Sequence, residues 1–244
     1  MTPVAPRAII LAAGRGSRMK HLTDEQPKCL AVLRGKPLLQ WQTEALRDAG
    51  IQDIAIVTGY QRERLQGRGL TEFHNPAWAQ TNMVSSLACA QAWLNAGPCI
   101  VSYSDIFYAP EAVSSLLHSS ADLAITYDPH WLQLWAQRFE NPLDDAETFK
   151  LNTQGCLTEI GHQPEHLDQV QGQYMGLLRF TPTAWAEVQR LREAMPPAAR
   201  DKAHMTGTLQ QVIAAQRLPI HALPYTGAWG EVDSADDLQL YNEQ

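Results

Sequence analysis

Apolar runs alternate with amphipathic stretches in the first part of the sequence, as in proteins that combine strands with helices. The run at 8–13 is apolar throughout and predicts a strand buried on both faces. Apolar residues then recur at helical spacing over 37–49, Gly50 is a typical helix stop, and 51–58 is a second apolar run. This alternation predicts a parallel, right-handed open sheet, in which ligands lie at the carboxyl ends of the strands.

The same pattern continues over most of the chain. Further helices are predicted at 78–96, 111–120, 181–195 and 206–216 and from Ala235 onward, and a short, charged helix is predicted at 61–67. Further strands are predicted at 73–75, 98–101, 121–127, 177–180 and 218–223, the last being the final strand. The predicted fold class is therefore α/β, a Rossmann-like three-layer α/β/α architecture around a mixed, mostly parallel central sheet.

The composition changes after the strand predicted at 121–127. Residues 130–139 are rich in tryptophan, and residues 141–150 are acidic and prone to turns. Residues 151–161 read as two strands around a turn at Gly155. These segments predict a small, lid-like β region attached to the main sheet.

Length and charge narrow the possible classes of function. The 244 residues suit one large domain over 1–244, although two small domains remain possible. The net charge of −7 argues against a nucleic-acid surface. The four cysteines show no C-x-x-C pair and no zinc spacing, which fits a reducing, cytoplasmic setting. No apolar run reaches the ~18 residues of a membrane span, and segment 1–7 is too short and polar for a signal peptide.

The loop after the first strand carries the clearest chemical signal. Gly14 and Gly16 follow the strand directly, so the backbone there can approach a ligand closely. Arg15, Arg18 and Lys28 add three cations, and such a glycine loop with Arg and Lys can hold a triphosphate. A Gly-x-Gly step alone can also be only a tight turn. It lacks the third glycine of the dinucleotide fingerprint and the Gly-Lys-Ser/Thr of the P-loop.

The longer string is more specific. The sequence L-A-A-G-R-G-S-R-M, followed by P-K-C-L nine residues after Arg18, resembles the signature of nucleotidyltransferases that act on sugar phosphates and phosphocholine. The later order F-H-N, T-N-M-V-S-S-L, strand, Asp105 and G-E-V-D-S is most similar to phosphocholine and 2-aminoethylphosphonate cytidylyltransferases. The resemblance implies Mg²⁺-dependent transfer of CMP from CTP to a small phosphorylated or phosphonate acceptor, with release of pyrophosphate. From the net charge and the lack of a long apolar run we expect no nucleic-acid or membrane partner, and we expect a monomer or homodimer.

Three acidic residues are the candidate metal ligands. Asp105 follows an apolar strand, where a buried carboxylate is costly unless it is paired or binds metal. Glu231 and Asp233 alternate with Val232, so an extended segment would point both carboxylates to one side. The simpler readings are that Asp105 caps a strand end and that Asp233 or Ser234 caps the next helix. In the resembled family, acids at these steps hold the catalytic Mg²⁺.

The resemblance also implies roles for the cations and the glycine loop. Arg18 would hold the β- and γ-phosphates, Lys28 would reach the α-phosphate and the acceptor phosphate, and both are catalytic candidates together with Asp105. Plain helix capping is the alternative for the polar stretch 82–86. The expected nucleotide-binding residues are Leu11, Ala12, Ala13, Gly14, Arg15, Gly16, Ser17, Arg18, Lys28, Gly59, Asn82, Ser85 and Ser86.

The lid-like β region is expected to cover the acceptor, whose identity is less well defined by the sequence. Four aromatic residues in or near the lid, Trp131, Trp135, Tyr174 and Trp229, could hold a cationic amine or choline head. They could equally be core packing. Asp144, Asp145 and Glu147 could bind an ammonium instead, or could form a solvated loop.

The two halves of the chain are expected to have different roles. Residues 1–128 are expected to bind the nucleotide, and residues 129–244 are expected to bind the acceptor and to supply the C-terminal metal ligands. Two alternatives remain. One is a sugar-1-phosphate nucleotidyltransferase that uses UTP, GTP or CTP. The other, of a different class, is a non-catalytic nucleotide sensor, against which Lys28, Asp105 and Asp233 together argue.

Overall fold

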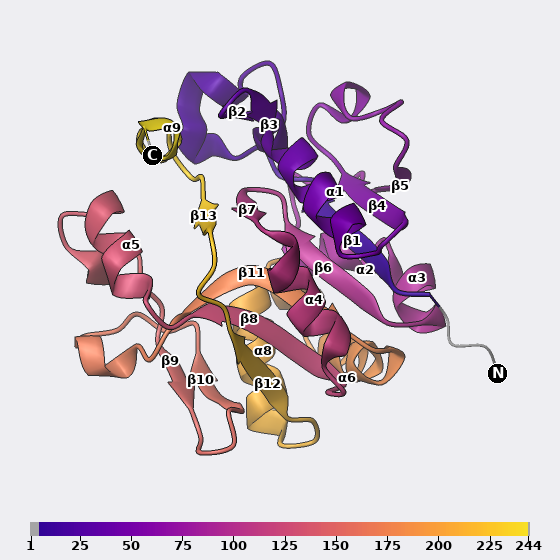
Figure 1. Cartoon of the computed structure of the whole chain (residues 1–244). Coiled ribbons are helices and arrows are strands. Elements are labelled where there is room, and N and C mark those ends of the chain that lie inside the picture. Colours follow the sequence, from indigo (N-terminus) through magenta and orange to yellow (C-terminus); the bar gives the residue numbers. More distant parts are fainter. Residues whose placement is uncertain (1–4, 244) are drawn as a thin grey trace.

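A seven-stranded sheet runs through the centre of the protein in the order β12–β8–β11–β6–β1–β4–β5 (Figure 1). The computed structural model describes residues 5–243, apart from the side chains at 20–22. Segment 1–7 is predicted to be too short and polar for a signal peptide, and its residues 1–4 lie outside this described part. The strands of the central sheet are β1 (Arg7–Ala12), β4 (Asp53–Thr58), β5 (Thr71–His74), β6 (Cys99–Tyr103), β8 (Leu123–Asp128), β11 (Gln173–Phe180) and β12 (Ile220–Pro224).

The sheet is mostly parallel, which confirms the predicted fold class. Only β11 runs antiparallel to its neighbours in this sheet, and it is inserted between β6 and β8. Because β11 and β12 come from the second half of the chain, both halves contribute to one sheet rather than forming separate layers.

Helices cover both faces of the sheet (Figure 1). On one face Ile10 packs in the same core as Leu46 and Leu116, whereas Ile9 and Leu11 pack on the other face. This alternation along β1 follows from the two-residue period of a strand, and it gives three layers. The helices of the described chain are α1 (Leu38–Asp48), α2 (Met83–Ala88), α3 (Gln91–Ala96), α4 (Pro110–His118), α5 (Trp131–Arg138), α6 (Pro182–Glu193), α7 (Pro197–Asp201), α8 (Met205–Ala215) and α9 (Ala235–Glu243).

Several sequence predictions need correction. The helix predicted at 78–96 is two short helices, α2 and α3, and the helix predicted at 61–67 is a single 3-10 turn, Arg62–Arg64. The tryptophan-rich segment, for which no element was predicted, forms α5. The strand at 218–223 is not the last, because β13 (Trp229–Glu231) follows and pairs with β7 (Ile106–Tyr108).

The lid-like region lies beside the sheet as a hairpin of β9 (Phe149–Leu151) and β10 (Leu157–Ile160). Gly155 has φ +74° in its turn, a conformation that glycine adopts without strain. The smaller elements β2 (Val32–Leu33) and β3 (Lys36–Pro37) pair near the N-terminal loop. In the described part of the chain, every helix is too short or too polar to cross a bilayer.

Candidate active site

Three carboxylates meet where the end of β6 lies beside the C-terminal segment. Asp105 lies between β6 and β7, and the antiparallel pairing of β7 with β13 places Ile106 opposite Glu231. The Val232 N–H donates to the Asp105 carbonyl oxygen at 2.8 Å. Carboxylate oxygens of Asp105, Glu231 and Asp233 consequently lie within 4.8 Å of one another. We call these three residues the carboxylate cluster.

The cluster has the donors that a divalent cation needs. Mg²⁺ and similar hard cations prefer carboxylate oxygens. The Asp105 Oδ1 atom is buried and has no hydrogen-bond partner among the described residues. A buried carboxylate oxygen without a partner is costly, and metal coordination would satisfy it. The residues at this position therefore fit a divalent metal ion.

Lys28 lies in the middle of the cluster. Its Nζ atom is 2.9 Å from the Asp105 Oδ2 and 2.5 Å from the Asp233 Oδ1, and its side chain is buried. Burial lowers the pKa of Lys28, but the carboxylates of Asp105, Asp233 and Glu231 outweigh burial, so the net shift is upward. Gly16 allows this approach, because it has φ +71° and a Cβ there would lie 2.8 Å from Lys28 side-chain atoms. Lys28 is thus held as a charged ammonium.

Arg18 adds an exposed cation at the same place. Its side chain is 64% exposed, and it contacts Asp233 at 2.9 Å and Asp145 at 3.8 Å. An exposed arginine that reaches a buried carboxylate can turn toward a phosphate at little cost. Arg15 differs, since it pairs with Asp24 at 2.8 Å and its guanidinium lies over the Tyr60 ring.

Arg138 is a charged residue next to the carboxylate cluster that the sequence analysis missed. Its side chain is fully buried at the end of α5, and it contacts Asp237 at 2.8 Å, Glu231 at 3.4 Å and Asp233 at 3.7 Å. Burial together with the charges of Asp233 and Asp105 raises the pKa of Glu231 to about 8. Arg138 opposes that shift and holds the C-terminal acids toward the cluster. A signal was present, because Trp131, Trp135 and Arg138 share one helical face, and an arginine on an apolar face implies buried acids.

Replacing Arg138 by methionine is expected to lower the melting temperature by about 10 °C. The substitution keeps an unbranched apolar side chain but leaves buried carboxylates without their cation, which costs about 3–5 kcal/mol. Thermal unfolding followed by circular dichroism measures the change. The matched control is Arg190→Met, which removes a half-exposed arginine from Glu187, a carboxylate that keeps its second partner Arg217, and should change the melting temperature much less. Equal melting temperatures for the two variants would contradict the structural role of Arg138.

A cavity of about 480 Å³ opens at the carboxyl end of β1, next to the cluster. Of the residues expected to bind the nucleotide, the structure places Leu11, Ala13, Gly14, Gly16, Ser17, Arg18, Lys28, Asn82 and Ser86 in its wall. Residues that the sequence analysis did not include also line it, namely Trp78, Thr81, Met83, Tyr103, Ser104 and His204. No sequence pattern marked this second set, because its members come from loops, helix starts and the end of β6, which only the fold brings together.

Four expected nucleotide-binding residues do not line this cavity. Ala12 points to the opposite core, as the alternation along β1 requires, and Arg15 is turned toward Asp24. Ser85 lies on another side of α2, where its hydroxyl accepts from Arg192 at 3.2 Å. Gly59 acts indirectly, because a Cβ there would meet the Ala13 carbonyl oxygen at 2.5 Å and Trp78 at 2.6 Å. The absence of a side chain lets Trp78 close the cavity wall.

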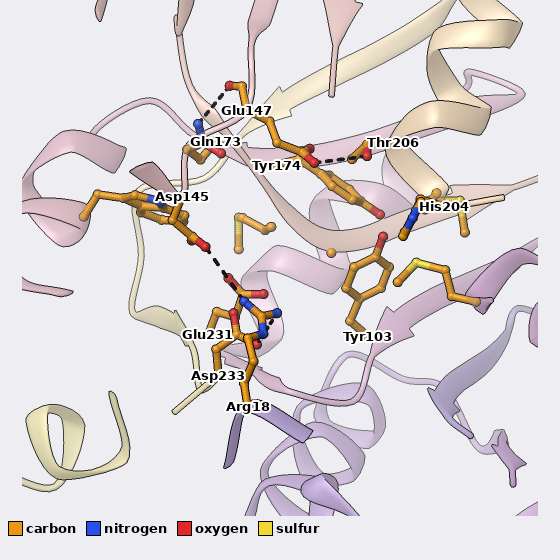
Figure 2. A pocket seen from close by; sticks show the side chains of 15 residues that line it. Arg18, Tyr103, Asp145, Glu147, Gln173, Tyr174, His204, Thr206, Glu231 and Asp233 are labelled. Carbon is orange, nitrogen blue, oxygen red and sulfur yellow. Dashed lines mark hydrogen bonds and ion pairs between the residues drawn. The ribbon is translucent and has the colours of Figure 1, made fainter. Parts of the chain in front are cut away.

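A second cavity of about 250 Å³ adjoins the first (Figure 2). Both are lined by Arg18, Met83, Tyr103 and His204. The carboxylate cluster supplies residues to both, since Asp105 lines the larger cavity and Glu231 and Asp233 line the smaller one. The remaining lining residues of the smaller cavity are Trp135, Asp145, Glu147, Gln173, Tyr174, Met175, Gly176, Met205 and Thr206.

The aromatic residues expected at the acceptor divide into two pairs. Trp135 and Tyr174 line the smaller cavity, whereas Trp131 and Trp229 do not. Trp131 is buried and donates its indole N–H to the Val170 carbonyl oxygen at 3.1 Å. Trp229 is buried against Trp135 and donates to Asp128 at 3.0 Å. Both indoles need these partners once they are buried, so they pack inside the protein rather than facing a ligand.

Comparison with known proteins identifies relatives along almost the whole chain. Residues 8–206 match the family model of the MobA-like NTP transferase domain. The chain is 35% identical to the CTP:phosphoglutamine cytidylyltransferase of Campylobacter jejuni, covering 97% of this chain and 99% of that protein. It is 39% identical to the choline-phosphate cytidylyltransferase of Streptococcus pneumoniae, over 33% of this chain and 37% of the relative. The structure of a CTP:phosphocholine cytidylyltransferase from S. pneumoniae superposes with a TM-score of 0.73 at 21% identity, covering 98% and 99% of the two chains.

Proposed function

Because the chain belongs to the MobA-like NTP transferase family, we propose that it is a Mg²⁺-dependent cytidylyltransferase for a small phosphorylated or phosphonate acceptor. CTP and the acceptor would give a CMP-linked product and pyrophosphate. The relatives that match this chain include cytidylyltransferases that their names assign to phosphoglutamine, choline phosphate and 2-aminoethylphosphonate. The prediction of the nucleotidyltransferase family from the glycine loop and the acidic steps is confirmed.

The observation that carries the proposal is the position of the carboxylate cluster. It lies where the two adjoining cavities meet, with Lys28 between its acids and Arg18 at its edge. The larger cavity, at the glycine loop, would hold CTP. The smaller cavity would hold the acceptor. Nucleotidyl transfer needs the α-phosphate of one substrate beside the phosphate of the other, and this boundary is where the two would meet.

In the proposed reaction an oxygen of the acceptor phosphate or phosphonate attacks the α-phosphorus of CTP. A new P–O bond forms, the bond between the α-phosphorus and its bridging oxygen to the β-phosphate breaks, and the electron pair leaves with pyrophosphate. The attacking oxygen is already anionic, so the protein needs no general base. Its task is to bring two anions together and to stabilise the charge that grows between them.

The residues of the boundary suit that task. We assign Arg18 to the β- and γ-phosphates, because it is exposed and can move. Lys28 would move from Asp105 and Asp233 toward the α-phosphate and the acceptor phosphate. Asp105, Glu231 and Asp233 would hold Mg²⁺, which when bound neutralises charge on the phosphates.

Pyrophosphate release, measured for the four nucleoside triphosphates against several acceptors, tests the proposal. We expect CTP with phosphoglutamine, phosphocholine or 2-aminoethylphosphonate to give the highest kcat/KM. Turnover only with UTP and a hexose 1-phosphate would contradict it and would favour a sugar-1-phosphate nucleotidyltransferase. Binding of a nucleotide without pyrophosphate release from any pair would indicate a non-catalytic sensor.

A further inference from the structure

The smaller cavity has two chemically different ends. Arg18, Glu231 and Asp233 lie together at one end, and Glu147, Tyr174 and Thr206 lie along the other (Figure 2). If the acceptor phosphate meets the nucleotide at the first end, the rest of the acceptor must extend toward the second. The groups at the second end therefore select the acceptor.

Glu147 is the principal charged group at that second end. It lies two residues before β9 and is mostly buried, and its carboxylate accepts a hydrogen bond from the Thr206 hydroxyl at 3.2 Å. Among the described residues no lysine, arginine or histidine lies within ion-pair distance of it, which is 4.0 Å. Burial, helped by the nearby Asp145 carboxylate, raises the pKa of Glu147, and the Thr206 hydrogen bond and the more distant His162 ring offset this shift only in part. A positively charged ligand would supply the missing partner.

The backbone at Glu147 is fixed by its neighbours. Gln173 on β11 donates its side-chain amide to the Glu147 carbonyl oxygen at 3.0 Å (Figure 2). Thr206 on α8 contacts the carboxylate from another direction. Glu147 is thus held by two elements that belong to the main fold, and its carboxylate has a defined position before any ligand arrives.

The rest of this end favours a ligand with N–H donors over a methylated ammonium. The hydroxyl groups of Tyr103 and Tyr174 point toward each other in the cavity (Figure 2). A trimethylammonium group has no N–H and is typically bound by several aromatic faces. Trp131 and Trp229 could have completed such a cage. Both are instead buried inside the protein, where their indole N–H groups donate to the Val170 carbonyl oxygen and the Asp128 carboxylate, respectively. A carboxylate with neighbouring hydroxyls instead suits an ammonium that donates hydrogen bonds.

We infer that Glu147 binds a primary ammonium group of the acceptor and so selects primary amines over quaternary ammonium compounds. The inference rests on the proposed function. Asp145, which also lines the cavity and contacts Arg18 at 3.8 Å, lies nearer the phosphate end and is not the ammonium partner. Glu147 is accordingly a specificity-determining residue, and the acceptor spans the cavity from Arg18 to Glu147.

Two matched pairs of acceptors test this inference with the wild-type protein and CTP. Phosphoethanolamine and phosphocholine differ only in N-methylation, and phosphoglutamine and its Nα-acetyl derivative differ only in the free ammonium. We expect the member with the primary ammonium to have the higher kcat/KM in each pair that turns over, by about tenfold or more. Equal or better use of the methylated or acetylated members would overturn the inference while leaving cytidylyl transfer intact. Failure of all four acceptors would count against the proposed function itself.

The variant Glu147→Gln tests the residue directly. Loss of a charge-assisted hydrogen bond should raise the KM of the primary-amine acceptor about 10- to 100-fold. The KM for CTP should change little, because Glu147 does not line the nucleotide cavity. Selectivity within each acceptor pair should also fall. The matched control Glu140→Gln makes the same change at an exposed position and should leave all values unchanged. Unchanged pair selectivity in a folded Glu147→Gln protein would overturn the assignment.

Discussion

Replacing Lys28 by methionine is expected to lower kcat by about 10²- to 10³-fold with CTP and a productive acceptor. Methionine keeps the length of the side chain but removes the ammonium that the fold holds between Asp105 and Asp233. A fixed cation beside the transferring phosphate stabilises the charge that develops there, and the loss of one such group typically costs that much in rate. Steady-state pyrophosphate release with purified protein measures the effect.

The same variant has a second expected property that does not depend on turnover. Lys28 contacts both Asp105 and Asp233 of the carboxylate cluster, so a divalent ion must compete with its ammonium group for these acids. Without nucleotide, the Lys28→Met protein should therefore bind Mn²⁺ more tightly than the wild type, as measured by electron paramagnetic resonance. The control is Lys36→Met, which removes a half-exposed lysine paired with Glu44 and should alter neither property. Near-normal activity of Lys28→Met would remove this residue from the mechanism.

Replacing Asp105 by asparagine is expected to lower kcat to a similar degree, by about 10²- to 10³-fold. The amide has nearly the shape of the carboxylate but lacks its charge, so it is a poor ligand for Mg²⁺. Asp105 Oδ1 has no hydrogen-bond partner among the described residues, so few internal contacts are lost. Lys28 also keeps its contact with Asp233. The activity should fall much more than the melting temperature, which should stay within a few degrees of the wild type.

A metal role for Asp105 also predicts how activity depends on the ion. The concentration of Mg²⁺ that gives half-maximal activity should rise in Asp105→Asn, and Mn²⁺ binding should weaken. Asp236→Asn is the matched control, because Asp236 lies near the cluster in sequence but is exposed on α9. An unchanged Mg²⁺ dependence in Asp105→Asn would show that this carboxylate is not a ligand, and the proposed site would have to lie elsewhere.

Arg138 illustrates a residue whose importance only its neighbours reveal. Its place on the apolar face of its segment implies buried acids, but the sequence does not show which acids they are. In the structure its guanidinium is buried and contacts Asp237, Glu231 and Asp233, which lie on or beside the C-terminal helix α9. A single buried arginine thus ties the tryptophan-rich helix α5 to the acids of the candidate site. That connection depends on the packing of two segments far apart in the chain.

The sequence alone determined the α/β class, the strand that leads into the glycine loop, and the candidate cations and acids. Each depends on local features: an apolar period, glycines at a strand end, and charged residues placed after apolar runs. These features carry the chemical types that the reaction needs, which is why the family could be identified from them. They also located Lys28 and Asp233, although these residues lie 205 positions apart.

Only the tertiary structure decided how those groups meet. The pairing of β7 with β13 brings Glu231 and Asp233 to Asp105, and no local pattern specifies that pairing. Packing also decided that Trp135 faces the smaller cavity while Trp131 and Trp229 are buried behind it. The physical reason is that periodicity fixes which side of an element is apolar, whereas the partner of that side depends on contacts made across the whole chain.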